Sequence, residues 1–199
     1  MSSSRSTPSL VLTVPSRRGF IGGSALTLSA GAIALLGGAP GLARAATMDP
    51  AKDAGILNVA LALEHEAINA YQLGAGSGLL QKGVLDVAVL FQSHHKAHRD
   101  ALVATIEKLG GKPVAEKPIG EYAQALRADT LKSQTDVLQL AARLELGATN
   151  AYLGVIPAFG DSALSKVAAR LAADETMHWT ALAGALGQPL PMAALGFGA

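Results

Sequence analysis

The chain of 199 residues contains no cysteine. Disulfide bonds and thiolate chemistry are therefore excluded, although an oxidising compartment is not. The sequence also lacks the alternation of apolar and polar residues that is typical of half-buried strands, while alanine and leucine are abundant. These absences favour a helical protein that is held together without covalent cross-links.

The N-terminus has the three parts of an export signal. Arg17 and Arg18 stand just ahead of a long apolar run that is rich in glycine and alanine, residues 20–42. Residues 43–45, Ala-Arg-Ala, then supply the small-x-small pattern that signal peptidase reads. Together these features indicate that residues 1–45 are a cleaved leader and not part of the fold.

The paired arginines, followed by Gly-Phe-Ile, resemble a twin-arginine signal. An ordinary secretory signal or a retained membrane anchor is the alternative. Glycines and Pro40 interrupt the apolar run, which argues against a permanent span of about 20 apolar residues. We therefore expect the twin-arginine export machinery as a partner, a periplasmic or other cell-envelope location, and no stable membrane anchor after cleavage.

Removal of the leader changes the net charge of the chain. The leader holds four of the sixteen basic residues and none of the fifteen acidic ones, so residues 46–199 have a net charge of −3. This balance excludes the basic surface that is typical of proteins that bind nucleic acid or anionic membranes. Residues 46–199 are long enough for one domain with a single core.

Four segments carry apolar residues at helical spacing, bounded by capping and stop signals. They cover about residues 50–73, 84–109, 133–156 and 162–186, and a short tail follows from about residue 187. The connection between the second and third segments contains several prolines and glycines and is too long for a tight turn, whereas the other two connections are short. The pattern predicts an all-α four-helix bundle of two antiparallel hairpins that are joined by a long crossover.

An internal repeat supports the two hairpins. The sequence LEHEAINAY at residues 63–71 aligns without a gap with LELGATNAY at residues 144–152. The sequence HKAHRDAL at residues 95–102 aligns in the same way with ETMHWTAL at residues 175–182. The first predicted helix therefore matches the third, and the second matches the fourth.

Ionisable residues interrupt the apolar stripe of each predicted helix about halfway along its length. Burial of unpaired carboxylates costs several kcal/mol, so a cluster of them needs a compensating charge. One or two divalent metal ions would provide it, and a metal-free network of glutamates and histidines, or a wet site, is the alternative. The six candidate metal ligands are Glu64, His95, His98, Glu145, Glu175 and His178.

Other polar residues near the stripes are given structural roles. His65 shares a face with Asn58 and Asn69, so we expect it to be solvated. Glu66 has no partner in the repeat, because Gly147 stands at the equivalent position, and only a bridging role would bring it into the site.

Aromatic residues and one further histidine flank the candidate ligands. His94 lies at the edge of the stripe and aligns with Asp174, which suits either a position behind the ligands or the surface. Tyr71 and Tyr152 lie two turns from the glutamates, where we expect core packing with a hydrogen bond from each hydroxyl. Trp179 is interpreted as a packing residue.

With these motifs the mature chain resembles the ferritin-like superfamily, in particular exported bacterial ferritin-like domain proteins with twin-arginine leaders. In that superfamily two helices each give a glutamate and two each give Glu-x-x-His. Glu64 and Glu145 match the single glutamates, and residues 175–178 match one Glu-x-x-His motif. The other motif departs from the pattern, because His95 stands where a glutamate is expected.

The resemblance implies a protein that binds one or two metal ions in the bundle core, with iron as the expected metal. Manganese, zinc and copper are the other candidates, since imidazole suits zinc and copper. The function expected is metal binding in the cell envelope without an assigned reaction, in a protective role under stress. The alternative is a di-iron or di-manganese oxidoreductase that acts on oxygen or peroxide. No catalytic residue is assigned, and a homodimer is compatible with the sequence.

Overall fold

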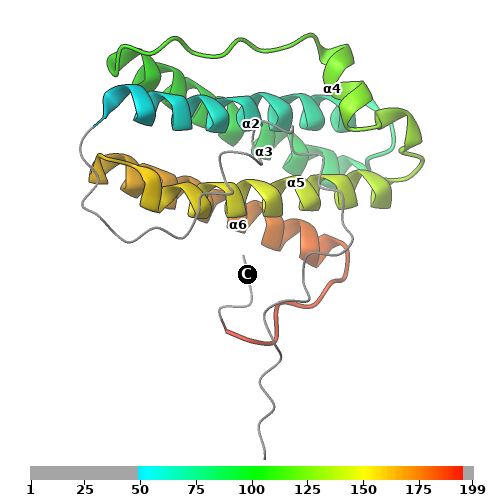
Figure 1. Cartoon of the computed structure of the whole chain (residues 1–199). Coiled ribbons are helices and arrows are strands. Elements are labelled where there is room, and N and C mark those ends of the chain that lie inside the picture. The colour runs from blue at the N-terminus through cyan, green and yellow to red at the C-terminus, as the bar shows by residue number, and fades with distance from the viewer. Residues whose placement is uncertain (1–48, 195–199) are drawn as a thin grey trace, which may run out of the picture.

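The computed structural model describes residues 49–194, and all regular structure within them is helical. The predicted leader lies outside the described residues. The elements are α2 (Pro50–Gly76), α3 (Lys82–Lys108), α4 (Ile119–Ala125), the 3₁₀ helix η1 (Ala128–Thr130), α5 (Gln134–Val155), the 3₁₀ helix η2 (Ile156–Ala158) and α6 (Ser162–Ala185). The prediction of an all-α bundle is therefore confirmed (Figure 1).

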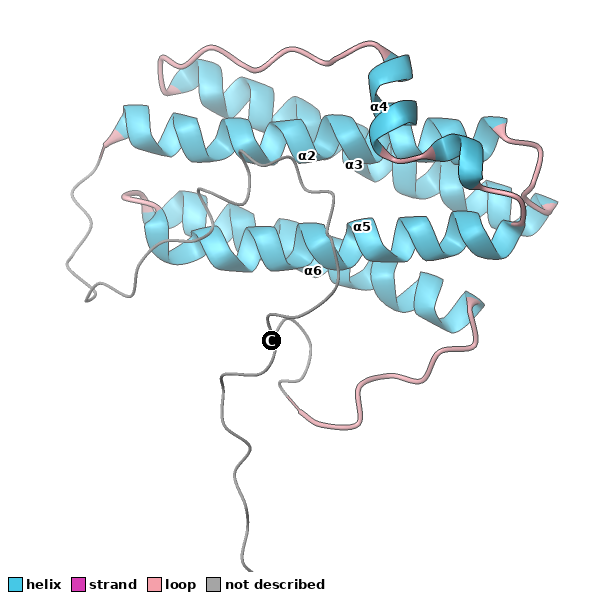
Figure 2. Ribbon diagram, turned by 45° about the vertical axis from the view of Figure 1, so that its right-hand side comes forward, coloured by secondary structure: helices cyan, strands magenta, loops and turns pink. Residues whose placement is uncertain are grey.

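The four long helices form two hairpins that lie one above the other. α2 packs along α3, and α5 packs along α6. α2 and α5 also contact each other, whereas α3 and α6 approach each other less closely (Figure 2). The crossover from α3 to α5 runs along the outside of the first hairpin, where α4 packs against α2.

Side-chain caps begin three of the long helices where the sequence predicts a start. A carboxylate oxygen of Asp49 accepts a hydrogen bond from the Lys52 amide (3.1 Å), and Pro50 takes the first helical position. The Ser133 hydroxyl caps α5, and the Asp161 carboxylate caps α6. Local sequence therefore sets these starts before any tertiary contact is considered.

The end of α2 differs from the prediction. The helix continues through Gly74 and Gly76, where the glycines were expected to break it. A Cβ atom at position 74 would lie 2.9 Å from Cγ1 of Val137 on α5, so the glycine allows the two helices to pack closely. The short helix α4 was also not predicted.

The prediction that His65 is solvated is wrong. His65 is only 5 % exposed, and its Nε2 lies 3.3 Å from the carbonyl oxygen of Val114 in the crossover. Asn58 holds the same segment, because its amide donates to the Lys112 carbonyl (3.0 Å) and its oxygen accepts from the Val114 amide (2.7 Å). This face is polar because it satisfies the backbone of the crossover, not because it faces water.

The bundle core divides into two halves. The first, here called the leucine-rich half, contains large buried side chains such as Leu61, Leu102 and Ile106. The second, here called the alanine-rich half, contains the buried residues Tyr71, Ala88, Phe91, Leu138, Ala142 and Leu182, with Ala141 packed against them. The ionisable residues predicted as ligands lie between the two halves.

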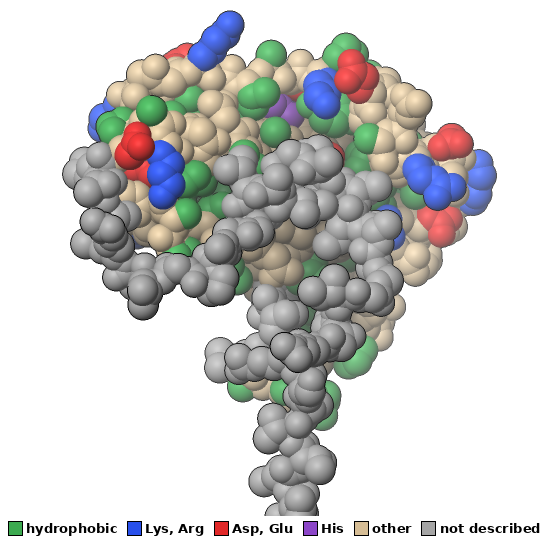
Figure 3. Space-filling view, in the orientation of Figure 1, with side chains coloured by type: hydrophobic (Ala, Val, Ile, Leu, Met, Phe, Trp, Pro, Cys, Tyr) green, Lys and Arg blue, Asp and Glu red, His purple; other side chains and the backbone are tan. Residues whose placement is uncertain are grey.

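On the face seen in Figure 3, acidic and basic side chains are interspersed rather than gathered by sign. Within residues 49–194, none of the helices is both long enough and apolar enough to cross a membrane.

Candidate metal centre

The structure brings the six predicted site residues together in the middle of the bundle. One residue comes from α2, two from α3, one from α5 and two from α6, and each is at most 7 % exposed. Their nitrogen and oxygen atoms form two overlapping groups, and the atoms of each group lie within 4.8 Å of one another. The first group is Glu64, His95, His98 and Glu175, and the second is His95, Glu145, Glu175 and His178.

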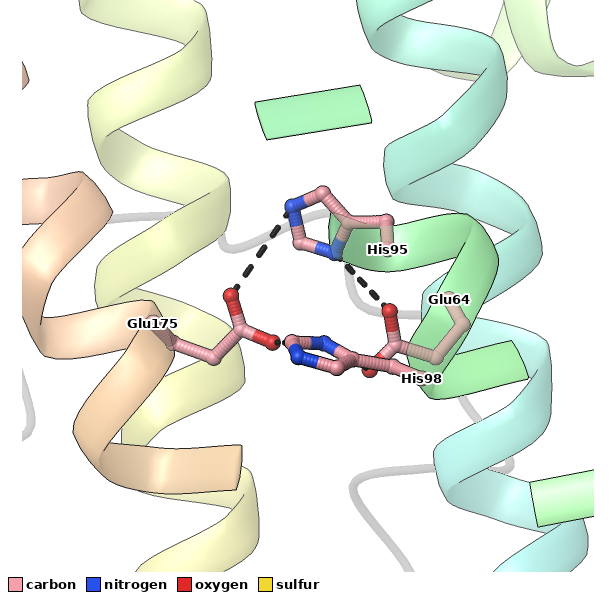
Figure 4. Close-up of side chains that lie close together, drawn as sticks. All are labelled: Glu64, His95, His98 and Glu175. Carbon is pink, nitrogen blue, oxygen red and sulfur yellow. Dashed lines mark hydrogen bonds and ion pairs between the residues drawn. The ribbon is translucent and has the colours of Figure 1, made fainter. Parts of the chain in front are cut away.

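The first group joins α2 and α3 to α6 (Figure 4). Nδ1 of His95 lies 2.8 Å from Oε2 of Glu64. Nδ1 of His98 lies 3.2 Å from Oε1 of Glu175 and 3.7 Å from Oε1 of Glu64. The four side chains point toward one another in Figure 4, so their donor atoms surround one small volume.

The second group has the same construction on the other side. Nε2 of His95 lies 3.2 Å from Oε1 of Glu145. Nδ1 of His178 lies 3.4 Å from Oε2 of Glu145 and 3.1 Å from Oε2 of Glu175. Glu175 thus presents one oxygen to each group, and His95 presents one nitrogen to each. The two groups therefore meet at Glu175 and His95.

Two tyrosines hold the glutamates of the opposite hairpin. The Tyr71 hydroxyl on α2 donates to Glu145 on α5, and the Tyr152 hydroxyl on α5 donates to Glu64 on α2. Burial, together with the neighbouring carboxylate, raises the pKa of both tyrosines well above 10, so both remain protonated donors. The hydrogen bonds expected of these two tyrosines are therefore present, and each crosses between the hairpins.

Two further residues stand behind the histidines. Nε2 of His178 faces Nδ1 of His94 at 2.9 Å, while the ring of Phe91 stacks on His178. Nε2 of His98 faces Oδ2 of Asp174 at 3.2 Å. Positions 94 and 174 are equivalent in the repeat, and each pairs with a histidine of the opposite hairpin. Asp174 was not among the predicted site residues, although its alignment with His94 in the repeat is a signal that points to it. Glu66 belongs to neither group.

The histidines and two of the glutamates stabilise each other's charges. Burial by itself lowers the pKa of His98, but the neighbouring carboxylates of Glu175 and Glu64 outweigh it and raise the pKa to about 10. Burial alone raises the pKa of Glu64 and Glu145, yet the histidines outweigh it and lower the pKa of both. Protons on the imidazoles therefore compete with a metal ion for the same nitrogen atoms.

The donor set nevertheless fits a metal. His98 Nδ1, Glu145 Oε2 and Glu175 Oε1 are buried within the two groups, and each lies 3.2–3.4 Å from another member of its group without forming a well-aligned hydrogen bond. Buried polar atoms of this kind are costly unless another group satisfies them. Three carboxylates and three imidazoles offer the oxygen and nitrogen ligands that iron, manganese and zinc accept.

Comparison with known proteins agrees with this arrangement. A family model described as a ferritin-like domain matches residues 52–188, which include the four long helices almost entirely and all six site residues. No curated protein and no solved structure matches the chain.

Proposed function

Because the chain belongs to the ferritin-like domain family, we propose that it binds one or two metal ions at the six-residue cluster, with iron as the metal. The observation that carries this proposal is the pair of overlapping groups of buried donor atoms, each within 4.8 Å. The shared position of Glu175 favours two ions over one, because each of its oxygens faces a different group.

Each residue has a distinct part in this proposal. Glu64 and His98 hold one ion, Glu145 and His178 hold the other, and Glu175 lies between them. Tyr71 and Tyr152 orient the two outer glutamates, and Asp174 and His94 orient the imidazoles of His98 and His178 by facing the nitrogen that points away from the site. When bound, iron would supply redox chemistry toward oxygen or peroxide.

The histidine at position 95 distinguishes this site from the superfamily pattern. Three carboxylates balance less positive charge than four, and a neutral imidazole adds none. We expect this deficit to favour the lower oxidation state of bound iron and to raise its reduction potential. Replacement of His95 with glutamate should lower the potential, which redox titration of the iron-loaded protein would measure.

Metal analysis of the purified protein tests the proposal directly. We expect one or two ions per chain in the wild type and a loss of metal in Glu175→Ala. Glu107→Ala is the matched control, because Glu107 is an exposed glutamate on α3 outside both groups. A wild type that neither retains added iron, manganese or zinc nor gains thermal stability from them would refute metal binding.

The second candidate function is an oxidoreductase that acts on oxygen or peroxide. The observation that favours it is an apolar cavity whose inner end reaches Glu145. Consumption of peroxide or oxygen by the iron-loaded wild type, but not by an iron-depleted sample, would support this function over metal binding alone.

We also propose that the protein reaches the cell envelope through the twin-arginine route, after it has folded around its metal. The paired arginines and the small-x-small pattern of the leader support this. Replacement of Arg17 and Arg18 by lysine should cause the precursor to accumulate in the cytoplasm. Undiminished export of that variant, or export of an uncleaved chain, would contradict the proposal.

A further inference from the structure

A cavity of about 180 Å³ lies in the alanine-rich half of the core. All four long helices contribute to its wall, which contains many alanines and glycines, among them Ala70, Gly74, Ala88 and Ala141. Small side chains at core-facing positions of facing helices leave space that larger residues would fill. The cavity is thus a consequence of composition at particular positions in this half.

The exposed residues that line the cavity belong to α3 and α6. Gly83 and Val87 of α3 and Ala181 and Ala185 of α6 border it and are exposed, and Val87 has 41 % of its surface accessible. α3 and α6 also approach each other less closely than the two helices of either hairpin. We infer that a small molecule enters from solvent between these two helices.

The inner end of the cavity reaches the candidate metal centre. Tyr71 and Glu145 are the two polar side chains among its lining residues, and the others are apolar. The Tyr71 hydroxyl already donates to Glu145, and Glu145 belongs to the second ligand group. A molecule in the cavity would lie end-on to this group, with apolar walls along the rest of its length.

We propose that this cavity is a binding site for a small apolar molecule, about the size of one aromatic ring, held with one end toward Glu145. A cavity of about 150 Å³ with apolar walls binds benzene in another protein, so the volume here is sufficient. Apolar walls offer no partners for a charged or strongly hydrogen-bonding molecule, whose desolvation would go uncompensated. The placement next to the metal rests on the proposed function, whereas binding to the cavity does not.

Titration of benzene into the metal-free full chain, followed by NMR, tests the site. We expect saturable binding of one benzene per chain and no binding of benzoate, which has the same ring with a charge. Ala88→Leu fills the cavity wall from α3, and Ala181→Phe closes its mouth from the exposed side of α6. Both should abolish detectable binding, and the second keeps the test decisive if the first fails to fold.

The matched control is Ala169→Phe, which makes the same change at an exposed position of α6 that does not line the cavity. It should bind benzene as the wild type does. The proposal is overturned if the wild type does not bind benzene, or if Ala88→Leu and Ala181→Phe bind it undiminished.

A second measurement tests the placement beside the metal. In protein loaded with Mn²⁺, the proton signals of exchanging benzene should broaden, whereas protein loaded with Zn²⁺ should leave them sharp. Benzene binding without this broadening, in a sample that retains manganese, would overturn the end-on placement. A chain that binds benzene but retains no metal would instead refute the proposed function and support the cavity as a site of its own.

Discussion

The two halves of the bundle core are built from the same repeated hairpin, yet they differ in how they are filled. In the leucine-rich half, Leu61, Leu102 and Ile106 are almost inaccessible to solvent, and Tyr152 packs among them. In the alanine-rich half, the equivalent Tyr71 borders a cavity of about 180 Å³. The candidate metal centre lies between the two halves and shares one tyrosine with each.

The two halves favour different properties: one favours the stability of the bundle, and the other leaves space in which a ligand can bind. In the leucine-rich half, Leu61 and Ile106 have no surface accessible to solvent, and close packing of such side chains favours stability. The cavity in the alanine-rich half forgoes such contacts and leaves room next to Glu145. The same repeated hairpin therefore builds one half with large, fully buried side chains and another half with a cavity lined by small residues such as Ala70 and Gly74.

The largest changes in the free energy of unfolding should come from two separate variants, each of which truncates one leucine to alanine in one of the halves. Leu61→Ala should lower the free energy of unfolding by about 4 kcal/mol, because it opens a new void in a filled region. Leu182→Ala removes the same atoms from the wall of an existing cavity and should cost about 2–3 kcal/mol. Urea unfolding of both variants measures the difference, and equal costs would contradict the contrast between the halves.

The gain in stability on metal binding should be the next largest effect. A ligand present at about 100 times its dissociation constant stabilises the folded state by about 2.7 kcal/mol. Added metal should therefore raise the melting temperature of the wild type, but not that of Glu64→Ala or Glu145→Ala. Thermal unfolding with and without metal provides the measurement.

The same pair of variants sharpens the comparison between the halves. Only Glu145→Ala changes a residue that lines the cavity, so only this variant should alter benzene binding. An altered affinity in Glu64→Ala would show that the two sides of the site are not independent.

The metal-free protein should lose stability as the pH rises. The pKa of His98 is raised in the folded state to about 10, above its ordinary value, so its contribution is complete below about pH 6.5 and is lost on the way to pH 10. We expect the free energy of unfolding to fall by about 2 kcal/mol between pH 7 and pH 9, with smaller losses in His98→Gln. Metal affinity should rise over the same range, because fewer protons compete for the imidazole nitrogens.

Denaturant titrations across this pH range check the first part, and metal titrations in buffers of different ionisation enthalpy count the protons released. Binding of metal at pH 7 without proton release would contradict the competition. A pH-independent stability of the metal-free protein would contradict the charge pairing of His98 with Glu175 and Glu64.

The smallest effects should come from removal of the two tyrosine hydroxyls. Tyr71→Phe and Tyr152→Phe should each cost about 1–2 kcal/mol in the metal-free protein, because each removes one hydrogen bond to a buried carboxylate. Chemical unfolding of both variants should give similar values despite their different surroundings. A cost confined to Tyr152→Phe would show that the cavity lets water replace the Tyr71 hydroxyl.

Local signals account for much of the agreement between sequence and structure. The helix caps at Asp49, Ser133 and Asp161 and the apolar periodicity determine where the helices start and which face each one buries. The end of α2 was predicted too early, because Gly74 is required by a close approach to Val137 that only α5 creates. A glycine in a sequence does not show whether it ends a helix or lets another helix approach.

The position of the candidate site was also within reach of the sequence. Six ionisable residues interrupt four apolar stripes at the same depth, and the structure brings all six together. Their role as metal ligands remains a prediction that metal analysis must test. The prediction for the helix face around His65 was wrong. Polar residues have the same spacing whether they contact water or the backbone of another segment, and here they contact the crossover.

The sequence by itself determined the helical architecture, the repeat and the depth of the six residues, because these depend on spacing along one chain at a time. Only the tertiary structure decided that Asp174 faces His98, that the crossover covers His65, and that a cavity leads to Glu145. These features arise where segments far apart in the chain meet. A cavity in particular depends on the summed volume of side chains from four helices, which no single segment contains.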